Sequence, residues 1–417
     1  MKNLLCSLVL LALISPTRGE DWPGFRGPTG QGISAEKGLP TDWSKTKNVA
    51  WSKNLPGEAW SSPIVWGDRV YVTTTTDGGA SCRILALSRL DGTIAWDVEV
   101  CRQKTLRKEG KNSYATPTPV TDGERVYAVY NDGSIAAVTV EGKPSWVNHD
   151  VNYYSQHGLG NSPILYRDTL IMAFDGSSDG PEKGVGWQTP WDRAVILALD
   201  KKTGKEKWRG KRGQSRIAHT TPIVVTVGGR DELISTAGDV IQGFDPATGE
   251  RRWSVKGAGE GVVPSPVFGG GLVFAVSGFG DPHLRAVKLT SDGEDKTTRA
   301  VAWAEKRNVP MLPSPVFVDP YLFFVTESGT AVCLEAATGK KKWDERLGGK
   351  FSASPVYADG HVYFLDEEGT TTVVQAKPVY SLVARNALQE PCQASMAVSQ
   401  GQLFIRSKDR LYCIGKK

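Results

Sequence analysis

One hairpin sequence occurs at least four times in this chain, and each copy ends on a tryptophan. "ALSRLDGTIAW" ends at Trp96, "ALDKKTGKEKW" at Trp208, "GFDPATGERRW" at Trp253 and "CLEAATGKKKW" at Trp343. Each copy contains the end of one strand, a polar turn with a glycine, and the start of the next strand. A chain that repeats one unit in this way is built from similar structural modules in series.

A Ser-Pro or Thr-Pro pair precedes each hairpin and marks the start of a unit. The seven starts are Ser62-Pro63, Thr118-Pro119, Ser162-Pro163, Thr221-Pro222, Ser265-Pro266, Ser314-Pro315 and Ser354-Pro355. In the last of these units, "SPVYADGHVYFLDEEGTTTVVQA" alternates apolar residues between glycine-bearing turns, which predicts three strands. The Trp strand is the fourth. Repeats of four antiparallel strands are typical of a β-propeller.

The two ends of the chain complete the blade count. The last unit, Ala394 to Gly415, has three predicted strands without a Trp strand, whereas the segment around Trp51 is a Trp strand without a unit before it. Together they make one blade and remove the open sheet edges. We therefore predict one all-β domain over residues 49–417. It is an eight-bladed propeller of four-stranded antiparallel blades, and the N-terminal strand completes its last blade. In the seventh blade, Tyr380 stands where Trp is expected.

The recurring tryptophans are interpreted as structural. A large flat side chain at one position of each blade can fill the space between neighbouring blades, and its indole N–H can bond a backbone carbonyl. The glycine of the turn supplies the positive φ that the hairpin needs. The residues given this role are Trp51, Trp96, Trp146, Trp208, Trp253, Trp303 and Trp343.

The first residues have the layout of an export signal. Lys2 precedes an apolar run from Leu4 to Ile14, and small residues follow around Gly19. Because the run is too short to span a bilayer, we expect a signal peptide over residues 1–19 and a leader segment over residues 20–48. The mature protein is expected to be a periplasmic or secreted monomer without a transmembrane segment. A formal net charge of +5 is too small and too scattered to predict nucleic-acid binding.

An exported protein can form disulfides. Cys82 and Cys101 lie symmetrically about the turn at Leu90 to Thr93, so on a hairpin they would face each other. We predict a disulfide between them, which a one-residue slip of the strands would prevent. The remaining cysteines after residue 19 are expected to be buried and free: Cys333, Cys392 and Cys413. The cysteine spacing matches no metal site.

The "ALDxxTGxxxW" hairpin with an upstream "SP(V/I)" strand resembles the PQQ-type propeller repeat of quinoprotein alcohol dehydrogenases and of the outer-membrane barrel-assembly lipoprotein scaffold. The resemblance runs from about Val49 to the C-terminus. It implies the fold but does not choose between an enzyme and a scaffold, because both share it. In those dehydrogenases two adjacent cysteines cover the quinone, and a calcium ion lies beside a catalytic aspartate. This chain has no Cys-Cys pair, and the calcium ligands find no matching positions.

A binding site is expected at one mouth of the channel, where the loops that lead into the innermost strands gather. The residues nominated there, from units three to five, are His157, Asn161, Arg216, His219 and Glu260. A cation, imidazoles and a carboxylate at one rim can bind an anionic or polar ligand. The alternative is that these are solvated loop side chains, or residues that satisfy turn carbonyls.

A long insertion, Phe174 to Arg193, is predicted between the second and third strands of blade three. It adds four candidates: Asp175, Asp179, Trp187 and Trp191. Aromatic and acidic residues on one loop suit the binding of a sugar or a peptide, and long loops in compact folds are often functional. The alternative is a cap that packs over the ring.

The sequence lacks two common catalytic motifs: it has no HExxH and no Walker loop. It therefore favours an exported, non-catalytic binding or scaffold module for a protein or polysaccharide partner, with no catalytic residue, metal or cofactor. The alternative is a dehydrogenase of alcohols or sugars that uses PQQ and calcium.

Overall fold

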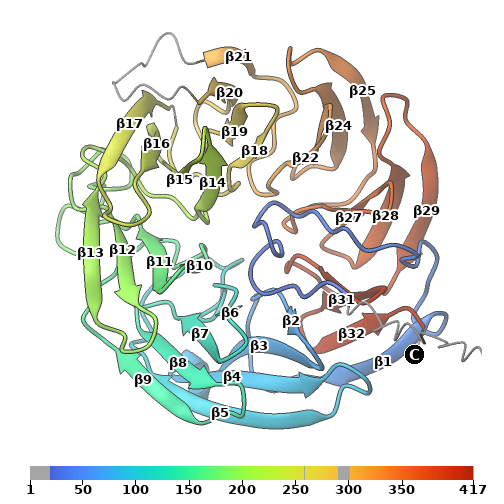
Figure 1. The fold of residues 1–417 in the computed structure, drawn as a ribbon, viewed down its shortest axis with the longest axis horizontal. Coiled ribbons are helices and arrows are strands. Elements are labelled where there is room, and N and C mark those ends of the chain that lie inside the picture. Colours follow the sequence, from blue (N-terminus) through green and yellow to red (C-terminus); the bar gives the residue numbers. More distant parts are fainter. Residues whose placement is uncertain (1–18, 258, 290–300, 417) are drawn as a thin grey trace, which may run out of the picture.

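The strands form eight four-stranded antiparallel sheets, which are arranged as the blades of a ring (Figure 1). The computed structural model describes residues 19–257, 259–289 and 301–416. In these ranges the one helical element is a short 3-10 turn, η1 (Asp77–Gly79). The predicted all-β, eight-bladed propeller is therefore confirmed.

The first four blades follow one another along the chain. Blade one contains β2 (Ile64–Trp66), β3 (Arg69–Thr76), β4 (Ser81–Ser88) and β5 (Ile94–Arg102). Blade two contains β6 (Val120–Thr121), β7 (Arg125–Val129), β8 (Ile135–Thr139) and β9 (Pro144–Asn148). Blade three contains β10 (Ile164–Tyr166), β11 (Thr169–Phe174), β12 (Val195–Asp200) and β13 (Glu206–Lys211). Blade four contains β14 (Ile223–Val227), β15 (Arg230–Ala237), β16 (Val240–Phe244) and β17 (Arg251–Lys256).

The remaining blades repeat the same order until the last one. Blade five contains β18 (Val267–Gly269), β19 (Leu272–Val276), β20 (Leu284–Lys288) and β21 (Val301–Glu305). Blade six contains β22 (Val316–Val318), β23 (Tyr321–Val325), β24 (Thr330–Glu335) and β25 (Lys341–Arg346). Blade seven contains β26 (Val356–Ala358), β27 (His361–Leu365), β28 (Thr370–Gln375) and β29 (Leu382–Ala387). Blade eight contains β30 (Ala397–Ser399), β31 (Gln402–Arg406), β32 (Arg410–Ile414) and β1 (Val49–Asn54).

Blade eight joins the two ends of the chain, as predicted. β1 pairs antiparallel with β32, and Trp51 lies opposite Cys413. Figure 1 shows the blue strand β1 beside the red strand β32. The closure covers the edge that β32 would otherwise expose, so blade eight has four strands like the other blades.

The predicted signal segment, residues 1–19, lies outside the described residues except for Gly19. Within the described ranges, no helix has the length and apolar character that crossing a membrane requires.

Each blade tryptophan sits opposite a small residue on the neighbouring strand, next to a β-bulge. Ala86 pairs with Trp96, Ala198 with Trp208, and the register shifts one position further along. The small partner leaves room for the indole to lie over the sheet, and the bulge twists the outer strand towards the next blade.

The indole N–H groups bond carbonyls of the following blade, as predicted, at five of the seven positions. Their acceptors are Arg89 for Trp51, Val140 for Trp96, Lys201 for Trp146, Ala336 for Trp303 and Lys377 for Trp343, at 2.7–3.0 Å. Trp253 instead donates to the Glu232 carboxylate of its own blade. The buried N–H of Trp208 has no protein partner among the described residues.

The turn glycine has a second role that the sequence did not show. The indole of Trp146 packs on Gly204, and that of Trp208 packs on Gly249, where a Cβ would lie 2.4 Å and 2.3 Å from the ring. These glycines also have φ of +71° and +75°. The Thr-Gly of the repeat therefore serves both its own turn and the tryptophan of the preceding blade.

The assignment of Tyr380 to the tryptophan position of blade seven is wrong. Ala384 pairs with Val373 at that position, and Tyr380 precedes β29 and packs edge-on against Trp343, with ring centroids 5.3 Å apart. Trp43 of the leader segment fills the space instead, because it is buried and stacks on Tyr363 of blade seven at 6.4 Å. A residue from outside the repeat thus supplies the missing aromatic contact.

Cys82 and Cys101 are directly opposite each other on β4 and β5, as the spacing predicted. A bulge at Val100 brings them into register, because Arg83 pairs with Glu99 and Cys82 pairs with Cys101. Both are free thiols in the structure, so the disulfide stays a prediction. Cys333, Cys392 and Cys413 are buried and free, as expected.

In an oxidising compartment we expect the Cys82–Cys101 bond to form, because facing residues of an antiparallel pair approach closely enough for it. It would close a short loop and stabilise the folded protein by about 3 kcal/mol. Mass spectrometry of unreduced peptides checks the bond, and Cys101→Ser should lower the free energy of unfolding by that amount. Two free thiols in the exported protein would contradict the prediction.

Candidate functional site

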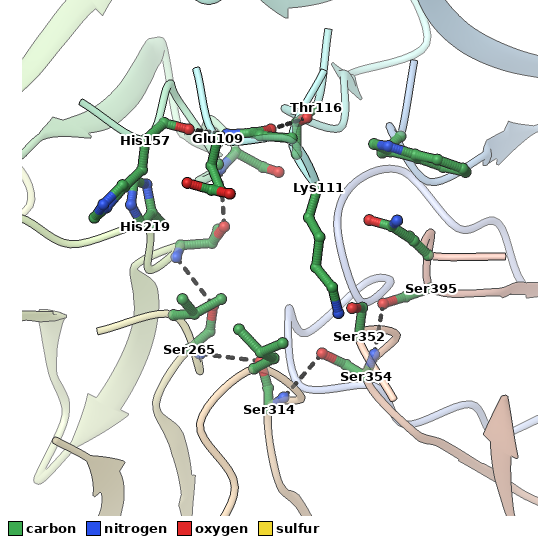
Figure 2. A pocket seen from close by; sticks show the side chains of 18 of the residues that line it. Glu109, Lys111, Thr116, His157, His219, Ser265, Ser314, Ser352, Ser354 and Ser395 are labelled. Atoms are coloured by element: carbon green, nitrogen blue, oxygen red, sulfur yellow. Dashed lines mark hydrogen bonds between the residues drawn. The ribbon is translucent and has the colours of Figure 1, made fainter. Parts of the chain in front are cut away.

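A belt of hydroxyl groups encircles the channel, and the Ser/Thr-Pro pairs form it. The backbone N–H of each such residue donates to the side-chain hydroxyl of the equivalent residue in the next blade. The seven bonds, 2.9–3.0 Å long, join in order Ser62, Thr118, Ser162, Thr221, Ser265, Ser314, Ser354 and Ser395. Figure 2 shows the part from Ser265 to Ser395.

The joint between blades eight and one uses a different contact. Arg406 of β31 is buried and donates from Nη1 to the Ser61 carbonyl and hydroxyl and to the Thr73 carbonyl, at 3.2, 2.7 and 2.8 Å. Burial lowers the pKa of this guanidinium to about 9. The joint between blades eight and one is therefore held by an arginine. The repeat pattern could not reveal this contact, because the other blades do not share it.

A cavity of about 540 Å3 lies inside the belt and opens at the loops that lead into the innermost strands. This opening is called the mouth below. The aromatic residues that line the cavity are Phe25, Trp60, Trp187 and Phe279, and its ionisable residues are Glu109, Lys111, His157, His219 and Glu260. A concave site of this volume with a few convergent polar groups is typical of a ligand site.

The leader segment closes the other end of the channel. Trp22 forms a β-bridge with Val65 of blade one, the Thr121 N–H of blade two donates to Pro23, and Ile33 forms a bridge with Tyr357 of blade seven. Figure 1 shows this blue segment crossing the interior of the ring. Phe25 of the same segment lines the cavity, so the site is a well with a floor and not an open channel.

Two histidines and a tryptophan form one wall. The His157 ring lies 6.1 Å from that of His219 and 5.7 Å, edge-on, from that of Trp187. Burial lowers the pKa of both imidazoles, that of His219 to about 3, so both are neutral at physiological pH. The buried ring nitrogens of His219 have no hydrogen-bond partner among the described residues.

The mouth is bordered by a strap and an ion pair. The strap is the connection between β5 and β6, whose Glu109 N–H and Asn112 side chain both donate to the His157 carbonyl, at 3.1 and 2.8 Å. Lys111 of this strap reaches across the cavity towards Ser352 (Figure 2). Its ammonium group bonds the Glu367 carboxylate of blade seven at 2.8 Å. Since Glu367 also accepts from Ser352, the strap is tied to the far side of the ring.

Four of the nine residues nominated from the sequence line the cavity: His157, His219, Glu260 and Trp187. Arg216 stands behind them. It makes two bonds of 2.7 Å to Asp239 and lies 3.5 Å from Glu260, so it holds that carboxylate in place. The lead-in loops therefore bring together residues from blades three to five, as the sequence indicated.

The other nominated residues lie outside the cavity lining. Asn161 is buried and donates to the Ala173 carbonyl, and Asp175 is buried in an ion pair with Arg212, which directly follows β13. Asp179 is exposed on the insertion. Trp191 forms a backbone bridge with Ser215. These positions give Asn161, Asp175 and Trp191 structural contacts, which the sequence could not distinguish from contacts with a ligand.

One family model matches more than half of the chain. Its description is outer membrane protein assembly factor BamB, and it matches residues 33–115, 192–315 and 292–378. The chain belongs to this family. The resemblance to the PQQ-type propeller repeat is thereby confirmed.

Two curated proteins that are similar to this chain in sequence are dehydrogenases. Quinoprotein glucose dehydrogenase of Escherichia coli strain K12 is 26% identical over 231 residues, covering 47% of this chain and 27% of that protein. Polyvinylalcohol dehydrogenase of Pseudomonas sp. is 23% identical over 196 residues, covering 46% of this chain and 29% of that protein. The matches span less than a third of either relative.

Solved structures share the fold at low identity. BamB from Moraxella catarrhalis has a TM-score of 0.60 and 15% identity, covering 88% of this chain and 96% of that chain. The europium-containing methanol dehydrogenase has a TM-score of 0.56 and 11% identity, covering 95% and 98%. Because a scaffold and an enzyme both match, the fold alone does not assign an activity.

The cavity carries ionisable residues from several blades. Its carboxylates, Glu109 and Glu260, come from different blades, and Arg216 already lies beside Glu260. Lys111 is bonded to Glu367. Within the described ranges, no three His, Cys, Asp or Glu side chains come together as metal ligands. No redox step is assigned to the cavity.

Proposed function

We propose that this protein is an exported, non-catalytic binding module that holds a protein or polysaccharide partner at the mouth of its central cavity. The observation that carries the proposal is the well itself, which is floored by the leader and bordered by the lead-in loops. Phe279 is 41% exposed at this mouth, although aromatic side chains are ordinarily buried. An exposed aromatic residue beside a polar rim is typical of a binding surface.

The rim gives the partner a rigid frame. Each lead-in loop is fixed at its end by the hydroxyl belt, and Arg216 fixes Glu260 through Asp239. A preformed site loses little conformational entropy when it binds, which favours recognition by shape. Membership of the BamB family, together with the match to the BamB structure, supports a scaffold or binding role.

Capture from the exported fraction of the source cells tests the proposal. The immobilised protein should retain a partner, and the double variant Trp187→Ala/Phe279→Ala should lose most of it, by about tenfold or more. Leu90→Ala is the matched control, because Leu90 is 68% exposed on the hairpin turn between β4 and β5 and is not part of the cavity lining. Equal capture by all three proteins would contradict the proposal.

The dehydrogenase alternative has a separate test. The protein incubated with PQQ and calcium should bind no stoichiometric quinone and should not reduce an artificial dye with alcohols or aldose sugars. The reason is that Lys111 and Glu260 of the cavity are already paired with Glu367 and Arg216. Dye reduction that depends on PQQ would show instead that the protein is a dehydrogenase.

A further inference from the structure

The His219 imidazole can bind a ligand group that both donates and accepts hydrogen bonds. Its two ring nitrogens are buried at the cavity wall without a partner among the described residues. A neutral imidazole has one N–H donor and one acceptor nitrogen. A carboxylate can satisfy only the donor and an ammonium group only the acceptor, whereas hydroxyl groups can satisfy both.

The hydroxyl belt offers donors around the same cavity. The belt oxygens of Thr118, Ser162 and Thr221 each accept a backbone N–H, and no acceptor lies within hydrogen-bonding distance of their own protons in the described part of the chain. These O–H groups are therefore available to acceptor oxygens of a ligand. Glu109 and Glu260, on the same side of the ring, supply acceptors for its donors.

The lysine of the cavity and the arginine behind it are both paired within the protein. Lys111 is bonded to Glu367 at 2.8 Å, and Arg216 lies 3.5 Å from Glu260. The histidines are neutral because burial holds the pKa of His219 at about 3 and lowers that of His157. An anionic ligand would find no free cation among the described residues of this lining and would face the Glu109 carboxylate, so an uncharged ligand fits better than an anionic one.

The walls also carry flat apolar faces. Trp60 lines the cavity from blade one, Trp187 from the insertion of blade three, and Phe279 from blade five. The insertion is held against the ring by the bond from the Ile217 N–H to the Gly186 carbonyl, at 2.7 Å, which fixes the neighbouring Trp187. Aromatic faces pack well against the C–H face of a ring-shaped ligand.

We propose that the cavity binds the end of a neutral oligosaccharide chain. A sugar ring combines hydroxyls that donate and accept, the absence of negative charge, and an apolar C–H face, and the lining suits all three properties. The inference rests on the proposed function of the mouth and names its ligand. A peptide segment is the competing occupant.

The test is calorimetric titration of the full exported chain with defined hexasaccharides. The neutral set contains oligomers of glucose, mannose, galactose and N-acetylglucosamine, and hexagalacturonate is the charged comparison. At least one neutral oligomer should bind, and Trp187→Ala should weaken it by at least about tenfold. His219→Phe, which removes both ring nitrogens at similar volume, should weaken it as well, whereas Leu90→Ala should leave the Kd unchanged.

Each result decides the inference. Thermal unfolding of every variant establishes that it is folded, and Phe279→Ala replaces Trp187→Ala if the latter unfolds. Binding of no neutral oligomer, binding of hexagalacturonate alone, or binding that is insensitive to Trp187, Phe279 and His219 would overturn it. If a captured protein depends on Trp187 and Phe279 while the sugars fail, the mouth still binds a partner and only the saccharide is wrong.

Discussion

Deletion of Asp21 to Gly57 should abolish the cooperative unfolding transition of the ring. The deletion removes β1, which is the outer strand of blade eight, together with the floor of the cavity. It also removes the buried side chains of Trp22, Trp43 and Trp51. Truncating one buried tryptophan costs about 3–5 kcal/mol, and a typical protein has only about 5–15 kcal/mol in total, so three such losses exceed the stability available.

A fusion distinguishes the loss of these contacts from a general effect of truncation. Residues 20–57 attached through a Gly/Ser linker to the C-terminus of the shortened chain should restore folding, because Gly415 already bonds the Asn48 carbonyl at 2.8 Å and Ser399 bonds that of Glu20. Circular dichroism and thermal unfolding of both proteins provide the measurement. A truncated protein that melts cooperatively at the temperature of the intact one would contradict the role of the leader and β1.

Asp175→Ala should lower the free energy of unfolding by about 3–5 kcal/mol. Burial raises the pKa of the Asp175 carboxyl, and its bonds to Arg212 oppose that shift and keep the pair charged. Arg212 is completely buried and also donates to Ser235 at 2.7 Å. Without Asp175 its charge remains in the interior with only neutral partners, which accounts for the size of the loss.

The same insertion supplies the control for this prediction. Asp179 is exposed and has no ion pair among the described residues, so Asp179→Ala should change the free energy of unfolding by less than about 0.5 kcal/mol. Urea unfolding of the two variants gives the comparison. A double variant, Asp175→Leu with Arg212→Met, should recover part of the stability because it leaves no buried charge. Equal losses at the two positions would show that the ion pair has no special role.

The architecture was readable from the sequence because it is local and repeated. Each hairpin, with its Thr-Gly turn and its Trp, carries the same information several times, and the alternation of apolar residues defines the strands without reference to distant parts of the chain. The closure of blade eight could be predicted as well, because a unit without a Trp strand and a Trp strand without a unit complement each other. The position of the mouth followed from this topology, and four of the nine nominated residues line the cavity.

The contacts that distinguish one candidate from another were decided only by the tertiary structure. Asp175 and Glu260 are both acidic loop residues in the sequence, yet Asp175 meets Arg212 in the interior and Glu260 faces the cavity. The strap that carries Lys111 to Glu367 joins residues far apart along the chain, and no local pattern encodes such a pairing. The leader lacks the repeat, so its position as the floor and the place of Trp43 in blade seven depended on the shape left by the eight blades. The sequence determined the ring through short-range periodicity, whereas the lining of its cavity depended on side chains that meet only after the ring has closed.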